Sequence, residues 1–485
     1  MTSVALRRVD IDRPETGGPR ARTIYSTGSL AIQGIVRLAI SVIVGRLAGP
    51  EALGQVMTGL SVASLLSLLW PSATGAAASR FLAAGQEVGD TQELRRVAGH
   101  LSRRTLVASL ALAPAAVIYW ALTHHDLPGA AVLGLLTLGL GGYAYARGVH
   151  TGARQVRRLV VLDMVGSLLG LAGTVALAAA GLQSVVVLSP LAVAYLAITV
   201  ASWPPARSGT PANAEEMDHF VRWSTLGTVA SAGLMQMVMV VAAHKLDGPT
   251  TGAFAAALNL ISPAALLANS FALVLTPDIA AAFGRGDRDG AVEMVRRSTE
   301  GLVAVMVIVF GVAVLLAPWV VLALWGSAFH ATSAIFALLS IGPLARAVAV
   351  PTVSSLSSRD RKGVEHAAMS TIAGLLVALA IWWVAPAQGW FVVAMGFSLA
   401  MILTAAQNVV RAWRLDSHRW GATWLRLLLG VAAVGATTVF RDKQDWPIGL
   451  TVLVTTALVV VWVTAHRRIL TSILRRQTPP STRST

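Results

Sequence analysis

Three arginines lie inside long apolar runs of this 485-residue chain, where a charged side chain is costly to bury: Arg37, Arg346 and Arg426. An arginine at the centre of a membrane helix costs about 2.5 to 3.5 kcal/mol on insertion scales, so each one is a functional candidate by default. A guanidinium is a planar fork of N–H donors that binds pairs of phosphate or carboxylate oxygens. The chemistry that these residues predict is recognition of an anion.

Arg37 is the strongest candidate, because it lies about thirteen residues into its apolar run, near the expected midplane of a membrane. Gln33 precedes it by one helical turn and would share its face. The alternative is a structural Arg37 that binds the backbone carbonyls of a broken helix. Arg346 has two prolines nearby, so it could bind substrate or bond backbone carbonyls that the prolines leave free, and the two alternatives are equally open. Arg426 is close enough to its helix end to extend its charge into water.

Acidic and amide side chains within the apolar runs are fewer. Asp163 and Asp278 are the candidates for coupling to an ion or relaying a proton, and the alternative is that they pair with neighbouring arginines. Asn259 is a candidate for binding substrate hydroxyl groups, although polar residues between membrane helices commonly hold the helices together. The chain has no cysteine and nothing that resembles a phosphate-binding loop, so we expect no cofactor, no metal site and no direct use of ATP.

The composition predicts a membrane protein. Hydrophobic residues make up 55% of the chain, charged residues only 13%, and the mean hydropathy is +0.67. One or two soluble cores could not bury so much apolar surface. About 20 apolar residues span a bilayer as a helix, and the chain has fourteen such runs: 24–45, 53–78, 105–122, 128–146, 159–180, 184–203, 222–243, 253–280, 301–323, 331–353, 367–385, 389–410, 421–440 and 446–465.

The basic residues support this number of spans. With a cytoplasmic N-terminus, 31 of the 38 lysines and arginines fall in the cytoplasmic tails and loops, 4 fall outside and 3 lie within spans. One helix more or fewer would invert every later loop and remove this asymmetry. The net charge of +15 then faces the anionic inner leaflet, so it calls for no nucleic acid partner.

A repeat divides the chain into two halves. The stretch GRLAGPEALGQ, from Gly45 to Gln55, returns 199 residues later as HKLDGPTTGAF, from His244 to Phe254, and both copies join two apolar runs on the outside. An arginine pair opens the third run and another opens the ninth, at 103–104 and 296–297. The alternative is chance similarity between apolar sequences.

The fold that we expect is an all-α polytopic membrane protein of about fourteen transmembrane helices, with two parallel six-helix repeats and two C-terminal helices. Its predicted parts are a disordered cytoplasmic tail at 1–23, a first half at 24–203, a cytoplasmic linker at 204–221, a second half at 222–410, a helix pair at 411–466 and a second tail at 467–485.

The residues from Thr27 to Leu69 resemble the first two helices of bacterial polysaccharide flippases. The shared pattern is a small residue, Arg46, Leu47, a small residue, Gly49-Pro50, an acidic residue and a nearby glycine. These flippases belong to the multidrug/oligosaccharidyl-lipid/polysaccharide exporter superfamily, which also holds the drug exporters and the flippase for the lipid-linked peptidoglycan precursor. Fourteen spans suit the flippases, whereas the drug exporters usually have twelve.

This resemblance implies a flippase that exports polyprenyl-diphosphate-linked oligosaccharide units across the cytoplasmic membrane by alternating access, for cell-surface polysaccharide biosynthesis. Both termini would be cytoplasmic. Its partners would be membrane lipids and the polymerase and glycosyltransferases of the same pathway, with no nucleic acid. The alternative is a drug/cation antiporter of the superfamily, which needs an unpaired carboxylate deep in the bundle, where this chain has Arg37. An enzyme of the pathway is not expected, because every outside loop is short.

Overall fold

The computed structural model describes residues 19–417, 420–467 and 469, so the predicted tails 1–23 and 467–485 lie largely outside the described residues. The described chain is built of helices, and its residues form no β-strand. All fourteen predicted runs coincide with helices, apart from breaks and end residues. The all-α polytopic fold is therefore confirmed.

Nine of the described helices are long and apolar enough to cross a membrane, or eleven if each of two bent pairs counts as one span. Helix α2 (Pro19–Leu69) holds the first predicted run and most of the second, which a kink at Gly49 separates, and the second run continues beyond the end of α2. Gly49 has φ of 84°, a left-handed conformation that glycine adopts without strain, and Pro50 then begins the second part. The first copy of the repeat therefore forms a sharp turn within α2.

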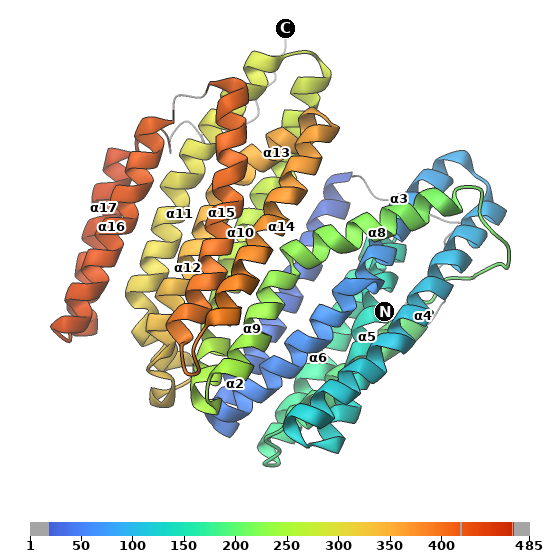
Figure 1. Cartoon of the computed structure of the whole chain (residues 1–485), viewed down its shortest axis with the longest axis horizontal. Coiled ribbons are helices and arrows are strands. Elements are labelled where there is room, and N and C mark those ends of the chain that lie inside the picture. Colours follow the sequence, from blue (N-terminus) through green and yellow to red (C-terminus); the bar gives the residue numbers. More distant parts are fainter. Residues whose placement is uncertain (1–18, 418–419, 468, 470–485) are drawn as a thin grey trace, which may run out of the picture. The chain divides into compact units, whose positions relative to one another are not determined.

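The first compact unit comprises the described residues up to Asn259 together with 385–393. After α2 its helices are α3 (Pro71–Val88), α4 (Thr91–His124), α5 (Leu127–Gly152), α6 (Val156–Ala179), the 3-10 turn η1 (Val185–Leu188), α7 (Ser189–Ala201), α8 (Ala214–Ser231), α9 (Gly233–Lys245) and the start of α10 (Gly248–Gly284). Figure 1 shows α4 beside α5 in this unit, and these two helices are in contact.

The second compact unit comprises residues 260–384 and the described residues from Ala394 on. Its helices are the rest of α10, α11 (Arg288–Leu324), the turn η2 (Ser327–Phe329), α12 (Thr332–Val348), α13 (Val350–Arg359), α14 (Arg361–Val384), most of α15 (Trp390–Asp416), α16 (Gly421–Lys443) and α17 (Ile448–Ala465). The C-terminal pair α16–α17 packs against α11 (Figure 1).

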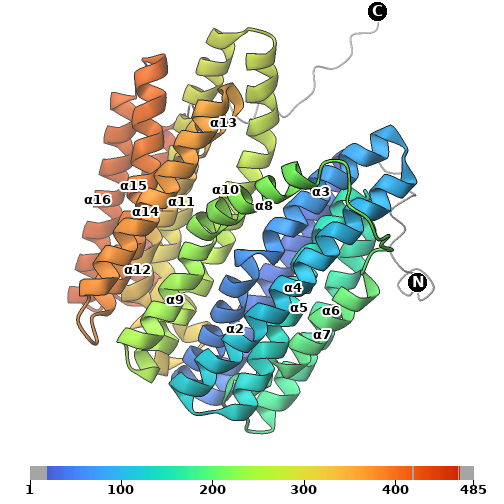
Figure 2. The same ribbon diagram turned by 45° about the vertical axis from the view of Figure 1, so that its right-hand side comes forward.

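The segment between the predicted halves is shorter than the sequence indicates. Helix α8 begins at Ala214, so only residues 202–213 connect α7 to α8, whereas the predicted linker continues to residue 221. The predicted span 222–243 is also broken, because α8 and α9 meet at an angle of 52° (Figure 2). The division into two repeated halves stays a prediction.

Loops that we assign to the same side of the membrane lie together within each unit. On the predicted outside, Lys245 Nζ donates to the carbonyl of Ala385 at 2.8 Å. On the predicted cytoplasmic side, the amide of Arg207 donates to the carbonyl of Arg95 at 3.0 Å. In the second unit, Asp416 accepts hydrogen bonds from two arginines of other predicted cytoplasmic segments, Arg288 and Arg359.

Candidate functional site

The first unit gathers polar side chains from four apolar helices in its interior. They are Gln33 and Arg37 of α2, Tyr143 of α5, Asp163 of α6 and Tyr195 of α7, and we call them the polar cluster. Helix α2 packs against α5 and α6, and α5 packs against α7, so the four helices converge. Small residues permit the approach: a Cβ on Gly142 would lie only 2.3 Å from Thr199 Cγ2.

Gln33 links three of these helices. Its amide Nε2 donates to the hydroxyl of Tyr143 and to Asp163 Oδ2, the latter at 3.4 Å. Asp163 is buried, with 2% of its surface exposed. A carboxylate in such a place is expensive unless hydrogen-bond donors surround it, and Gln33 supplies one of them.

The two tyrosines lie against each other on the α5–α7 side of the cluster. Their ring centroids are 5.0 Å apart at an interplanar angle of 49°. The Asp163 carboxylate and the guanidinium groups of Arg37 and Arg147 all lie within electrostatic reach of Tyr195. Together with Arg147 of α5, the polar cluster therefore combines two cations, one carboxylate, an amide and two phenol groups.

Arg37 is the member with unused hydrogen-bonding capacity. Its Nε atom is buried and has no hydrogen-bond partner in the described part of the chain. A buried donor that lacks an acceptor costs about 1 to 3 kcal/mol, and more when it is charged. An anionic ligand would supply that acceptor in a charge-assisted bond.

The structure brings three of the six predicted site residues together, namely Gln33, Arg37 and Asp163. Asn259 is buried elsewhere in the first unit, where its Nδ2 bonds the carbonyl of Ala255 at 3.0 Å and lies 3.6 Å from Met57 Sδ. This contact is the helix-to-helix role that we state as the alternative for Asn259.

The other two predicted residues lie in the second unit. Arg346 is in the last turn of α12, just before a 40° bend into α13, and its side chain is exposed. Asp278 is an exposed residue of α10. No ion pair joins Asp278 to an arginine in the described residues, so the predicted alternative of pairing finds no support there.

The sequence patterns did not identify Tyr143, Tyr195 and Arg147 as candidate site residues. The chain has only five tyrosines, and a phenol inside an apolar run was a signal that could have been used. Their grouping with Arg37 depends on how four helices pack, which the spacing along the sequence does not reveal.

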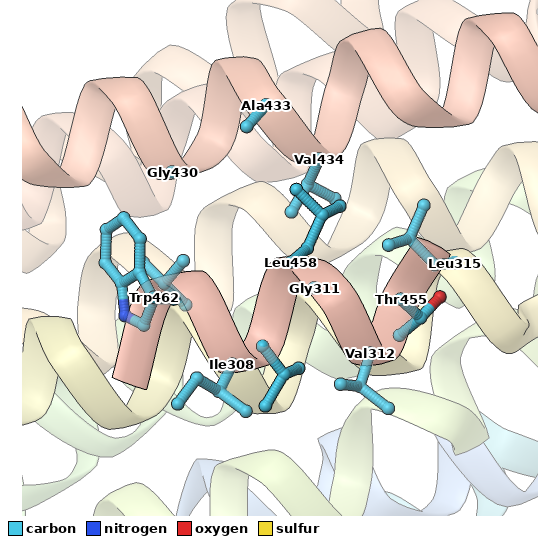
Figure 3. Close-up of a pocket in the computed structure, with 12 residues that line it drawn as sticks. Ile308, Gly311, Val312, Leu315, Gly430, Ala433, Val434, Thr455, Leu458 and Trp462 are labelled. Carbon is cyan, nitrogen blue, oxygen red and sulfur yellow. The ribbon is translucent and has the colours of Figure 1, made fainter. Parts of the chain in front are cut away.

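A second interior feature is a small cavity between α11, α16 and α17 in the second unit, with a volume of about 50 Å³. Figure 3 shows its lining, which is apolar except for Thr455 and the indole of Trp462. Trp462 Nε1 already donates to the carbonyl of Ala304 at 3.0 Å. The cavity is too small and too apolar to hold a sugar or a phosphate group.

The described residues contain no group of three or more His, Cys, Asp or Glu side chains that could hold a metal ion. The polar cluster is held by hydrogen bonds and electrostatic contacts. It offers donors for an anion and a buried carboxylate that can take up a cation or a proton.

Comparison with known proteins supports a transporter fold. No protein-family model and no curated protein sequence matches the chain. Among solved structures, the lipid II flippase MurJ in an inward closed conformation has a TM-score of 0.70 at 11% identity, covering 93% of this chain and 100% of that one. An inward-facing multidrug resistance MATE family transporter of the MOP superfamily has a TM-score of 0.63 at 14% identity, covering 79% of this chain and 94% of that one.

A third similar structure is a MOP superfamily transporter from Pyrococcus furiosus, described by a reversed polarity of its binding pocket that suggests a different function. Its TM-score is 0.54 at 16% identity, covering 90% of this chain and 99% of that one. The chain thus has the fold of the MOP superfamily transporters, which include flippases and drug exporters.

Proposed function

We propose that this protein is a flippase that exports polyprenyl-diphosphate-linked oligosaccharide units across the cytoplasmic membrane by alternating access. The product would be used for cell-surface polysaccharide biosynthesis, together with a polymerase and glycosyltransferases. The proposal includes cytoplasmic termini and transport without covalent chemistry. Its main support is Arg37, whose Nε is buried and has no hydrogen-bond partner among the residues that the structure describes.

The diphosphate chemistry explains why an arginine suits this position. A diphosphate carries several negatively charged oxygens, which a planar guanidinium can bind in pairs. Gln33 and the tyrosine hydroxyls are groups that hydrogen-bond sugar or phosphate oxygens equally well. The similarity in fold to a lipid II flippase is consistent with a lipid-linked substrate.

The alternative is a drug/cation antiporter, and Asp163 is the observation that favours it. This carboxylate is buried in the same cluster, where it could exchange a proton against a cation. Two guanidinium groups, Arg37 and Arg147, nevertheless lie near the same tyrosine, so positive groups outnumber the carboxylate. We therefore favour the anionic substrate.

A vesicle assay separates the two functions. Purified protein is reconstituted into vesicles with a fluorescent polyprenyl-diphosphate oligosaccharide, and flipping is read as the fraction that an impermeant reductant quenches. We expect Arg37→Ala to abolish flipping, whereas Arg426→Ala, which removes an exposed arginine from α16, retains it. Accumulation of ethidium driven by a pH gradient, with no flipping of the lipid, would instead establish the antiporter.

A further inference from the structure

A cavity of about 650 Å³ lies at the polar end of α4, outside the polar cluster. We call it the α4 cavity, and its lining includes Trp70, His100, Arg103, Arg104, Val107 and Ala111. The connection between α7 and α8 contributes Thr210. All of these residues belong to the first unit.

The lining changes from basic to apolar along one face of α4. Arg103, Val107 and Ala111 are spaced by one helical turn each, and all three are exposed. Val107 is 61% exposed, and Leu110 beside it is 55% exposed. Exposed apolar residues on a membrane-spanning helix contact lipid chains, so the cavity opens where the bilayer meets the polar surface.

The charges at the polar end are not balanced. Asp218 is shared, because it pairs with Arg104 and also lies 3.0 Å from His100 Nε2. Arg103 has neither an ion pair nor a side-chain hydrogen bond with the part of the chain that the structure describes. The guanidinium of Arg103 thus faces the cavity without an acceptor from the described chain.

The repeat in the sequence matches the pair Arg103-Arg104 with Arg296-Arg297, and the charges of this second pair are neutralised by glutamates. Arg296 bonds Glu293 at 2.7 Å and Glu300 at 2.8 Å, and Arg297 also pairs with Glu293. These glutamates lie three or four residues away on the same helix, where ion pairs form locally. The positions three and four residues from Arg103 on either side are glycine, histidine, leucine and valine, at 99, 100, 106 and 107, so α4 supplies no such carboxylate.

The connection between α7 and α8, which contributes Thr210 to the cavity, is held against α4. The amide of Ala212 donates to Glu93 Oε1 at 2.6 Å, and a Cβ on Gly99 would lie 2.6 Å from the carbonyl of Arg207. This close contact with α4 means that the cavity is preformed. A ligand would not have to order the segment in order to bind.

We propose that the α4 cavity binds an anionic glycerophospholipid of the leaflet on this side of the membrane. The lipid phosphate accepts hydrogen bonds from Arg103 and Arg104, and one acyl chain lies along Val107 and Ala111. Trp70 is the aromatic residue at the level of the head group, where indoles are favoured. In the orientation of the proposed function this is the cytoplasmic leaflet, where anionic lipids attract basic segments.

Trp70 provides the test, although the chain has 14 tryptophans. The full-length protein is placed in nanodiscs of phosphatidylcholine that contain increasing brominated phosphatidylglycerol, and fluorescence quenching is measured for the natural chain and for Trp70→Phe. The difference between the two is the quenching of Trp70. We expect it to reach half its maximum at about tenfold less brominated phosphatidylglycerol than brominated phosphatidylcholine, which corresponds to about 1.4 kcal/mol of preference.

Arg103→Gln should abolish this preference, whereas Arg297→Gln, an exposed arginine paired within its own helix, should keep it. Circular dichroism and gel filtration confirm that both variants are folded.

Equal quenching by the two lipids, or an unchanged preference in Arg103→Gln, would overturn the proposal. Relief of the quenching by inorganic phosphate would show a site for free anions instead, and displacement by an equimolar polyprenyl diphosphate would show a substrate entrance. These results do not depend on the flipping assay, so the two proposals can fail separately.

Discussion

Arg37 and Arg441 are two arginines with buried guanidinium nitrogens and contrasting surroundings. Arg441, which is 4% exposed, donates to the carbonyls of Val314 at 3.1 Å and Leu315 at 2.6 Å and pairs with Asp442. The Nε of Arg37 has no such acceptor in the described chain. Two further arginines of the described chain, Arg158 and Arg359, also have a buried Nε without a partner, but each donates from Nη2 to an acceptor in the protein. Arg37 makes no such bond with the described residues, and this contrast supports a ligand-binding role for Arg37.

Replacing Arg37 with lysine should leave intermediate flipping activity, between that of the natural protein and the inactive Arg37→Ala. Lysine keeps the positive charge but loses the planar fork that binds two oxygens at once. The initial rate of flipping in vesicles, normalised to the amount of inserted protein, measures the effect. Full activity of Arg37→Ala in the same assay would show that Arg37 is structural.

At the scale of elements, a proline inside a helix leaves a backbone carbonyl without its helical donor, and a side chain from another helix can replace that donor. Pro318 lies inside α11 and has no N–H, so the carbonyl of Val314, four residues earlier, loses its helical partner. Arg441 of α16 donates to that same carbonyl. Helix α16 of the C-terminal pair is thereby bonded to α11 at the carbonyl that lacks its helical donor.

Arg441→Gln should lower the thermal stability of the purified protein, because the carbonyl of Val314 would be left buried without a donor. The cost is about 1 to 3 kcal/mol for a buried group that loses its partner. Thermal unfolding followed by tryptophan fluorescence measures this loss of stability, since the ring centroid of Trp319 lies 5.8 Å from Arg441 Cζ. Arg426→Gln on the same helix is the control and should melt like the natural chain. If Arg441→Gln melts at the same temperature as that control, the bond from Arg441 to Val314 does not stabilise the protein.

The two copies of the repeat meet each other in the first unit. A Cβ on Gly54 would lie 3.0 Å from the amide of Gly252, and one on Gly252 would lie 1.9 Å from the carbonyl of Pro50. The second part of α2 and the start of α10 therefore cross with their backbones in contact. In a carrier that works by alternating access, this contact on the predicted outside must open during each cycle.

A disulfide across this crossing should stop transport reversibly. A Cβ on Gly248 would lie 2.7 Å from Glu51 Cγ, so cysteines at these two positions fall within reach of each other. The natural chain has no cysteine, so no other bridge can form. We expect oxidation of the double variant Glu51→Cys/Gly248→Cys to block flipping and reduction to restore it, with both single variants unaffected. Unimpaired flipping by the fully bridged protein would exclude opening at this crossing.

For the whole molecule, patterns along the sequence predict the helices well and their packing poorly. Apolar runs and basic loops indicate the helices because each crossing is a local property of about 20 residues. Gln33 and Arg37 share a face for the same local reason, whereas the hydrogen bond from Gln33 to Asp163 could not be read from the spacing. The grouping of Tyr143 and Tyr195 with Arg37 and the carbonyl acceptors of Arg441 could not be predicted, because each depends on which helices pack together. The bend between α8 and α9 carries no proline that would have marked it.

The predicted sidedness can be checked with single cysteines. Those at Thr250 and Ala387 should react with an impermeant thiol reagent in intact cells, because both lie in loops assigned to the outside. One at Ser208 should react only after the cells are opened. The structure places residues near Thr250 and Ala387 together, since the amide of Asp247 donates to Gln388 Oε1 at 3.0 Å. Labelling of Ser208 in intact cells would overturn the fourteen-span topology.

For the proposed diphosphate substrate, charge leads to a prediction of the energy source. A diphosphate that moves outward travels toward the positive side of the membrane, and each elementary charge that crosses the full field gains about 2.3 kcal/mol per 100 mV. Positive groups at the polar cluster also favour return of the empty carrier toward the negative interior, although charges near the midplane cross only part of the field. When loaded, the same groups partly cancel the substrate charge, so the outward step gains less than the diphosphate alone.

We therefore expect the membrane potential, rather than proton exchange, to reset the empty carrier. In reconstituted vesicles, removing the potential at constant pH should slow flipping more than removing the pH gradient at constant potential. Asp163 and Asp278 are the acidic candidates for a proton route, and Asp163 alone belongs to the polar cluster. Asp278→Asn, which changes an exposed carboxylate of the second unit, should thus leave the rate unchanged. The reverse ranking of the two gradients, together with loss of activity in Asp163→Asn, would identify a proton antiporter.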